Sequence, residues 1–94
     1  MEILLKGVKY TVLKNEKEAL NVEELEERFT DYFESFDFIL GDYSYGKLRL
    51  KGFNNKENKN FKPMNDIATL DSYILKYCAF GCRHFVISRV KSLQ

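Results

Sequence analysis

Basic and aromatic residues occupy every second position near the middle of the chain. They are Tyr43, Tyr45, Lys47, Arg49, Lys51 and Phe53. A regular strand projects alternate side chains from one face, so the row from Tyr45 onward would share a surface, which Tyr43 could join from the preceding loop. Surfaces that bind single-stranded RNA combine basic side chains, which contact phosphates, with aromatic rings, which stack on bases. The row therefore predicts a binding face for RNA or a ribonucleoprotein. An acidic protein partner and an ordinary solvated sheet face are the alternatives.

The segment from Gly41 to Gly46 holds one carboxylate, one hydroxyl and two phenols between two glycines. A catalytic interpretation would use Asp42 as a general base and Tyr45 as a hydrogen-bond donor. The segment lacks the spacing of a phosphate-binding loop, a dinucleotide fingerprint or a nucleophile elbow. We therefore predict no catalytic residue, and we interpret Gly41, Asp42 and Gly46 as parts of a turn in which Asp42 bonds to its own backbone.

Two cysteines and the only histidine lie close together near the end of the chain. Cys78 and Cys82 would lie on one face of a continuing helix, with His84 two residues further on. Zinc sites usually need four ligands, and the chain holds no other Cys or His, so we predict no metal site and no cofactor. Buried structural cysteines are the simpler interpretation, and a redox thiol pair is the alternative.

An acidic helix face, from Glu23 to Glu34, is opposite in sign to the basic row. An ordinary charged surface explains it most simply. A contact between this face and the basic row of a second copy is the alternative.

Length and composition favour one domain. The chain has 94 residues, 45% of them hydrophobic and 15% aromatic, which is enough for one core without disulfides or a metal. Its formal net charge is +1, so neither a nucleic acid nor an acidic partner is favoured by charge alone. The start of the chain lacks the features of a signal peptide, and no apolar run is long enough for a membrane span. Two cysteines are too few for a disulfide framework, so we expect a cytoplasmic protein in which they stay reduced.

Hydrophobic periodicity and turn residues predict the order of the elements. We expect two N-terminal strands joined at Lys6-Gly7, a helix over 22–34, strands over 36–40 and 47–51, a helix from about 66 to 80, and a final strand over 84–90. The strand at 36–40 would end in a turn at Gly41-Asp42. The Asn- and Lys-rich residues 54–63 predict a flexible surface loop. The fold class is therefore α+β, an N-terminal β-hairpin followed by α-β-β-α-β. Its mainly antiparallel sheet packs against two helices, and a ferredoxin-like split βαβ order is one topology that fits.

Two longer motifs carry a family resemblance. The block FDFILGDYSYGKLRLKGF over 36–53 and YCAFGC over 77–82, together with Gly7-x-x-Tyr10, resemble the YutD-like family of low-GC Gram-positive bacteria. Tyr43-Ser44 stands where many relatives have Trp-Gly. The resemblance implies that residues 1–94 form a single YutD-like domain. It brings no established biochemical role and no catalytic residues.

The residues favour a binding module over an enzyme, because the distinctive side chains form surfaces rather than a catalytic set. RNA or a ribonucleoprotein is the first partner that we expect. A protein-interaction or regulatory domain without nucleic acid is the alternative, favoured by the near-neutral charge and the many aromatic residues.

Overall fold

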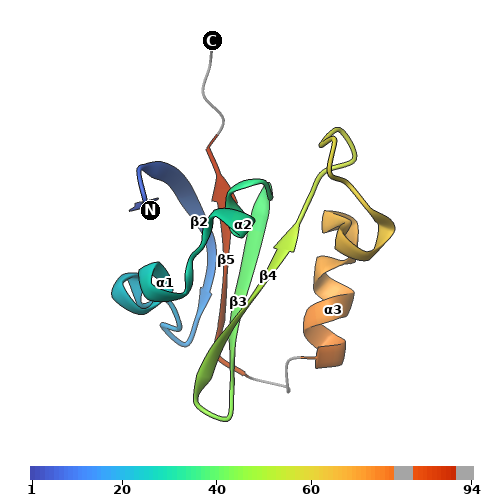
Figure 1. Cartoon of the computed structure of the whole chain (residues 1–94). Helices are drawn as coiled ribbons and strands as arrows, with labels where there is room; N and C mark the ends of the chain where they lie inside the picture. Colours follow the sequence, from blue (N-terminus) through green and yellow to red (C-terminus); the bar gives the residue numbers. More distant parts are fainter. Residues whose placement is uncertain (78–81, 91–94) are drawn as a thin grey trace.

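The computed structural model describes residues 1–77 and 82–90, which form one five-stranded sheet with helices on both of its faces (Figure 1). The elements are β1 (Glu2–Leu5), β2 (Val8–Glu16), α1 (Val22–Arg28), α2 (Asp31–Glu34), β3 (Phe38–Ser44), β4 (Lys47–Phe53), the 3-10 turns η1 (Pro63–Asn65) and η2 (Ile67–Thr69), α3 (Leu70–Tyr77) and β5 (His84–Arg89). The α+β class and the hairpin-α-β-β-α-β order are confirmed.

The strand order is β1-β2-β5-β3-β4, and each described pair of neighbours is antiparallel. The last strand of the chain thus lies in the centre of the sheet, between the two hairpins β1-β2 and β3-β4. A ferredoxin-like order would pair β2 with β4 at the centre, whereas β5 and β3 pair there. That part of the prediction is wrong, because sequence periodicity cannot say which non-local neighbours a strand takes.

The sheet has a hydrophobic core on each face. Residues of α1 and of the segments around it pack on one face, over a cluster of Leu5, Tyr10, Ala19, Leu25, Phe29, Ile39, Leu48, Phe85 and Ile87. On the other face, a smaller cluster of Leu40, Phe53 and Val86 is packed by Ile67, Leu70, Tyr73 and Ile74 from η2 and α3. Burial on both faces explains why β5 reads as the continuous apolar run 85–87 rather than as an alternation.

Strand β3 runs straight through Gly41-Asp42, so the predicted turn at that position is wrong. A Cβ atom on Gly41 would lie 2.1 Å from the ring of Phe85 on the neighbouring strand. A glycine is therefore required at this position because the Phe85 ring leaves no room for a side chain, and not because the backbone conformation demands one. The chain turns instead at Tyr45-Gly46, where φ is 53° and 74°, the positive values of a tight two-residue hairpin turn.

The helix predicted over 22–34 is divided in two. Asn21 caps α1, since its side chain accepts a hydrogen bond of 3.1 Å from the Glu24 N–H. The helix ends at Phe29, whose extended backbone (ψ 126°) turns its ring into the core, edge-on against Tyr10. The short helix α2 then carries Tyr32, which is 68% exposed.

Residues 54–63, predicted to bury little, are anchored by a fully buried Asn54. Its side-chain oxygen accepts hydrogen bonds from the Asp37 N–H at 2.9 Å and the Asn58 amide at 3.0 Å. Its backbone bonds to Asn65 and Ile67, which forms a parallel bridge beside the end of β4. The prediction of an exposed loop is therefore wrong for Asn54. The flexibility of the rest of the loop stays a prediction.

No helix among the described residues has the length and apolar character needed to cross a membrane. The cytoplasmic location stays a prediction.

We expect Gly41→Ala to lower the free energy of unfolding by about 1–3 kcal/mol, because the added methyl group overlaps the Phe85 ring. Chemical denaturation would measure this cost. Phe85→Leu should itself destabilise by leaving a gap, but it should make Gly41→Ala much cheaper in the double variant. Additive costs would show that the two residues do not share this space.

Candidate functional site

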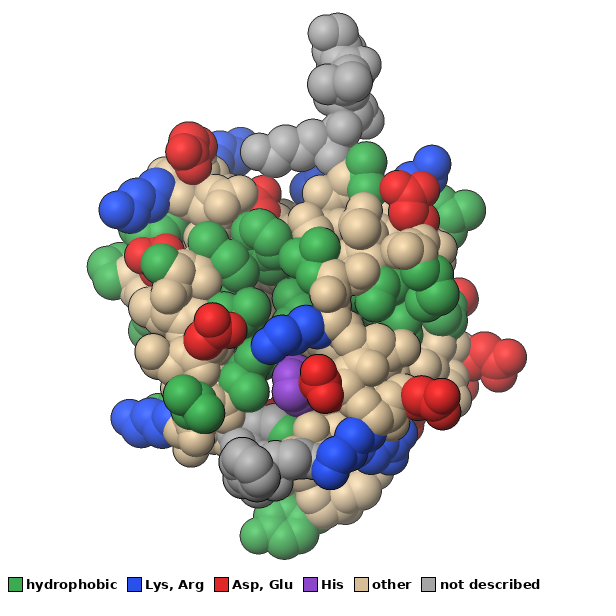
Figure 2. Space-filling view, turned by 180° about the vertical axis from the view of Figure 1, so that it is seen from behind, with side chains coloured by type: hydrophobic (Ala, Val, Ile, Leu, Met, Phe, Trp, Pro, Cys, Tyr) green, Lys and Arg blue, Asp and Glu red, His purple; other side chains and the backbone are tan. Residues whose placement is uncertain are grey.

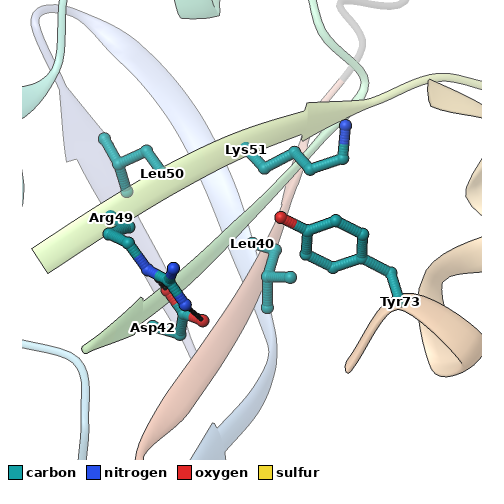
Figure 3. Close-up of a pocket in the computed structure, with 6 residues that line it drawn as sticks. All are labelled: Leu40, Asp42, Arg49, Leu50, Lys51 and Tyr73. Carbon is teal, nitrogen blue, oxygen red and sulfur yellow. Dashed lines mark hydrogen bonds and ion pairs between the residues drawn. The ribbon is translucent and has the colours of Figure 1, made fainter. Parts of the chain in front are cut away.

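A polar hollow lies between strands β3 and β4 and helix α3. It has a volume of about 170 Å³ and is lined by Leu40, Asp42, Arg49, Leu50, Lys51 and Tyr73. Figure 3 shows the Arg49 guanidinium over Asp42 on one side and the Tyr73 ring, on α3, opposite them. The strand register brings the first pair together, because Asp42 and Arg49 are direct partners across β3 and β4.

Asp42 and Arg49 form a bidentate ion pair. The Arg49 Nε and Nη2 atoms donate to the two Asp42 carboxylate oxygens at 3.0 Å and 2.7 Å. These hydrogen bonds raise the pKa of Arg49, so its charge is fixed at any ordinary pH. Asp42 is only 4% exposed, whereas 48% of the Arg49 side chain is accessible. With both oxygens occupied, Asp42 is poorly suited to the role of general base, and Arg49 still presents its Nη1 atom.

Lys51 and Tyr73 complete the polar wall of the hollow. The Lys51 ammonium lies 5.2 Å from the centre of the Tyr73 ring and 5.0 Å from that of Phe53. Burial, and then the charge of Asp42, raise the pKa of Tyr73, so its phenol stays protonated and can donate a hydrogen bond. Two cations thus face one carboxylate, and the hollow keeps a residual positive charge.

A row of titratable side chains crosses the same sheet face. Register pairs Glu16 with His84, His84 with Asp42, and Asp42 with Arg49, on four neighbouring strands. His84 is 8% exposed, and its Nδ1 atom lies 3.1 Å from the Cys82 carbonyl oxygen. Figure 2 shows this histidine, in purple, beside an acidic and a basic side chain. Within the described residues, the hydrogen bonds of this row join Asp42 to Arg49 and His84 to Cys82, while the His84 Nε2 atom is buried without a hydrogen-bond partner, and no group of three metal-ligating side chains is formed.

The predicted basic and aromatic row lies only partly on one face. Strand β4 projects Lys47, Arg49, Lys51 and Phe53 from the same face, as their alternation predicts. Tyr43 lies on the opposite face, where its hydroxyl donates to Glu24 and the Arg83 guanidinium lies 4.4 Å from its ring centre. Phe53 is fully buried under α3, and Tyr45 is fully exposed in the hairpin turn. These three aromatic residues therefore offer no shared stacking surface.

The three basic residues of the row have different surroundings. Lys47 is exposed at the start of β4, and only Arg49 and Lys51 line the polar hollow. Of the residues grouped around the expected turn, Gly41 and Asp42 belong to strand β3, and Gly46 alone lies in the turn.

The sequence did not predict Tyr73 as a site residue. The one sequence feature that could have indicated it is its spacing of four residues from Tyr77, which places both rings on one side of a helix. In the structure the two ring centres lie 4.6 Å apart on α3. The contacts that bring Tyr73 to Lys51 depend on how α3 docks on the sheet, which no local pattern specifies.

The structure describes one of the two cysteines of the predicted thiol pair. Cys78 lies outside the described residues. Cys82 is disulfide-bonded, so the expectation that it stays reduced is wrong, and its sulfur lies 3.9 Å from the His84 Nδ1 atom. A redox role for the pair stays a prediction.

Comparison with known proteins gives consistent matches over nearly the whole chain. Residues 4–88 match the family described as "YutD-like: Putative antitoxin YutD-like". The "Putative antitoxin YutD" of Bacillus subtilis (strain 168) is 39% identical over 89 residues, which cover 95% of this chain and 98% of the relative. The solution NMR structure of protein yutD from B. subtilis superposes with a TM-score of 0.80 at 38% identity, covering all of this chain and 86% of that one.

The two halves of the ion pair should not be equivalent. Arg49→Met leaves a buried carboxylate without a partner, so we expect it to cost about 1–3 kcal/mol of unfolding free energy. Asp42→Asn leaves a half-exposed guanidinium, which water can solvate, and should cost about 1 kcal/mol or less. Chemical denaturation of both variants and of the double variant tests this. A double variant no more stable than Arg49→Met would contradict the explanation.

High pH should destabilise the protein partly through Tyr73. Its pKa is raised above 10.0 in the folded chain, so the unfolded chain releases the phenol proton first and stability is lost as the pH rises through and beyond about 10. In Tyr73→Phe the loss of stability between about pH 9 and 11 should be smaller, and phenolate absorbance at 295 nm should lack one late-titrating group. An unchanged absorbance curve above pH 10, apart from total amplitude, would count against the raised pKa.

Proposed function

The chain belongs to the YutD-like family, and on that premise we propose that it is a protein-binding module whose polar hollow holds an acidic side chain of the partner. The observation that carries the proposal is the arrangement of donors in the hollow. Lys51, the Arg49 Nη1 atom and the Tyr73 phenol surround it, while the one carboxylate present is already satisfied by Arg49.

The electrostatics favour a carboxylate as the bound group. Among the described residues no acidic side chain pairs with Lys51, whose only hydrogen bond is a long one of 3.5 Å to the Met64 carbonyl oxygen. A hydrogen bond to a charged group contributes about 1.5–3 kcal/mol, so an incoming carboxylate could gain from both Lys51 and Arg49. Because Asp42 fixes the guanidinium, little side-chain freedom is lost on binding.

Two of the three rings in the row are unavailable for stacking on RNA, and the third, Tyr45, lies apart from them in the hairpin turn. Recognition of single strands depends on aromatic faces that remain open for stacking. Tyr43 and Phe53 face opposite sides of the sheet, and the first is held by Glu24 and Arg83 while the second is buried. A protein partner therefore replaces RNA as the partner that we propose, and RNA becomes one outcome of the test.

The Bacillus subtilis relative is named a putative antitoxin, YutD, which supports a role in binding. A protein that acts against a toxin must contact another molecule, and the polar hollow is a place where this chain can do so.

Titration of ¹⁵N-labelled protein with the peptide Ac-Glu-Val-Glu-Val-Glu-Val-NH₂ tests the proposal. We expect localised amide shifts at residues 49–51 and at Tyr73, with an affinity that falls as salt rises. Lys51→Glu should weaken binding at least about tenfold, a change of about 1.4 kcal/mol. Lys59→Glu makes the same charge change in the exposed loop and should leave affinity within about twofold.

Two results would overturn the proposal. One is equal weakening by Lys51→Glu and Lys59→Glu, which would reduce the effect to overall charge. The other is localised shifts with oligouridine in place of the peptide, which would restore RNA as the partner.

A further inference from the structure

A second hollow lies on the opposite side of strand β4. It too has a volume of about 170 Å³, and it lies between β4, the aromatic side chains of α2 and the segment around Met64. Tyr32 and Met64 are 68% and 75% exposed at its rim, and Phe36 packs its ring on Gly52 at its floor. We call it the aromatic groove. It shares Leu50 and Lys51 with the polar hollow, so the two hollows flank the same stretch of β4.

Strand β4 is an edge of the sheet, paired with β3 alone in the described part of the chain. The two-residue turn makes Ser44 and Lys47 a hydrogen-bonded pair, and in an antiparallel ladder such pairs alternate with pairs that point their backbone groups apart. The N–H and C=O groups of Leu48 and Leu50 therefore point away from β3. No backbone hydrogen bond joins them to another described segment.

The chain itself already uses this edge. Asn54 follows in the same outward-pointing series, and its N–H donates to the Asn65 carbonyl at 2.7 Å while its C=O accepts from the Ile67 N–H at 3.0 Å. The outer edge of the strand is thus able to accept a further strand, and the internal pairing stops at the point where the two hollows begin.

We propose that the partner contributes an extended segment that adds to the sheet along the free edge of β4. Side chains of a strand alternate between its two faces, so successive residues of the segment would enter the polar hollow and the aromatic groove in turn. The first hollow takes an acidic side chain, and the second takes an aliphatic one. This inference rests on the proposed function for its acidic positions and adds the backbone pairing and the alternation.

Charge decides between a foreign segment and a second copy of this chain. Two β4 edges placed side by side would bring Lys47, Arg49 and Lys51 of one copy close to the same residues of the other, and like charges in neighbouring strand positions are destabilising. An acidic segment would instead be attracted to these three basic residues. The basic residues thus suppress self-pairing and favour a partner with carboxylates at alternate positions.

Four hexapeptides of equal charge test whether binding depends on backbone hydrogen bonds and on the alternation of side chains. The alternating peptide Ac-Glu-Val-Glu-Val-Glu-Val-NH₂ is compared with the block peptide Ac-Glu-Glu-Glu-Val-Val-Val-NH₂, which has the same charge and composition. Two further peptides are N-methylated, one at every Glu and the other at every Val. In an added strand the N–H groups of only one of these residue types face β4. We expect one methylated peptide to lose binding at least about tenfold and the other to stay within about threefold.

Amide exchange and one pair of variants give a second readout. The Leu50 N–H, which points away from β3, should become protected from hydrogen exchange at least about tenfold when the alternating peptide is bound. Met64→Ser removes an apolar rim residue of the groove and should weaken the alternating peptide about threefold or more. Leu75→Ser, a change at an 81% exposed position of α3 that lines neither hollow, should have no effect.

The outcomes separate the two proposals. Strand addition is overturned if the block peptide and both methylated peptides bind as well as the alternating one, with Leu50 unprotected. In that case binding that still depends on Lys51 would leave the polar hollow as a charge-recognition site. Loss of the Lys51 dependence would overturn the proposed function itself.

Discussion

The insertion of β5 between β2 and β3 is the constraint on which the rest of the structure depends. This strand is buried on both faces, with Phe85 and Ile87 in one core and Val86 in the other. A strand buried in this way needs cover on both sides, so α1 with its neighbouring segments packs on one face and α3 on the other. Because β5 takes the central position, β4 is left at an edge, and the surface that we propose for binding exists only as a consequence.

The same insertion sets the electrostatics of the site. Asp42 lies between His84 on β5 and Arg49 on β4, and it is buried because α3 and its neighbours cover that face. A carboxylate at this depth needs a charged partner, and β4 supplies it through Arg49. The guanidinium is therefore held in place by the requirements of folding. A fixed donor of this kind is what a binding site needs, since it costs little entropy to order.

Local features of the fold could be predicted from the sequence, and non-local ones could not. The Lys6-Gly7 turn, the Asn21 cap and the burial of Leu48 follow from short patterns whose physics is local. Gly41 was misread because a glycine needed to make room for a ring looks the same in sequence as one needed for a turn. The surroundings of Tyr43 and the position of Tyr73 in the hollow could not be predicted, because they depend on partners far along the chain, at Glu24 and at the sheet.

The basic residues of β4 show how one sequence feature can serve two physical ends. Charged residues on an edge strand prevent sheets from pairing with copies of themselves, which alone would explain Lys47 and Lys51. Protection of an edge, however, needs only exposed charge, and it gives no reason for hollows on both sides of Leu50. An edge strand that binds a partner must meet two conditions. It must not pair with copies of itself, and it must still accept another strand. Positive charge combined with alternating polar and apolar hollows meets both conditions, since it repels an identical edge and leaves an acidic, alternating segment unopposed.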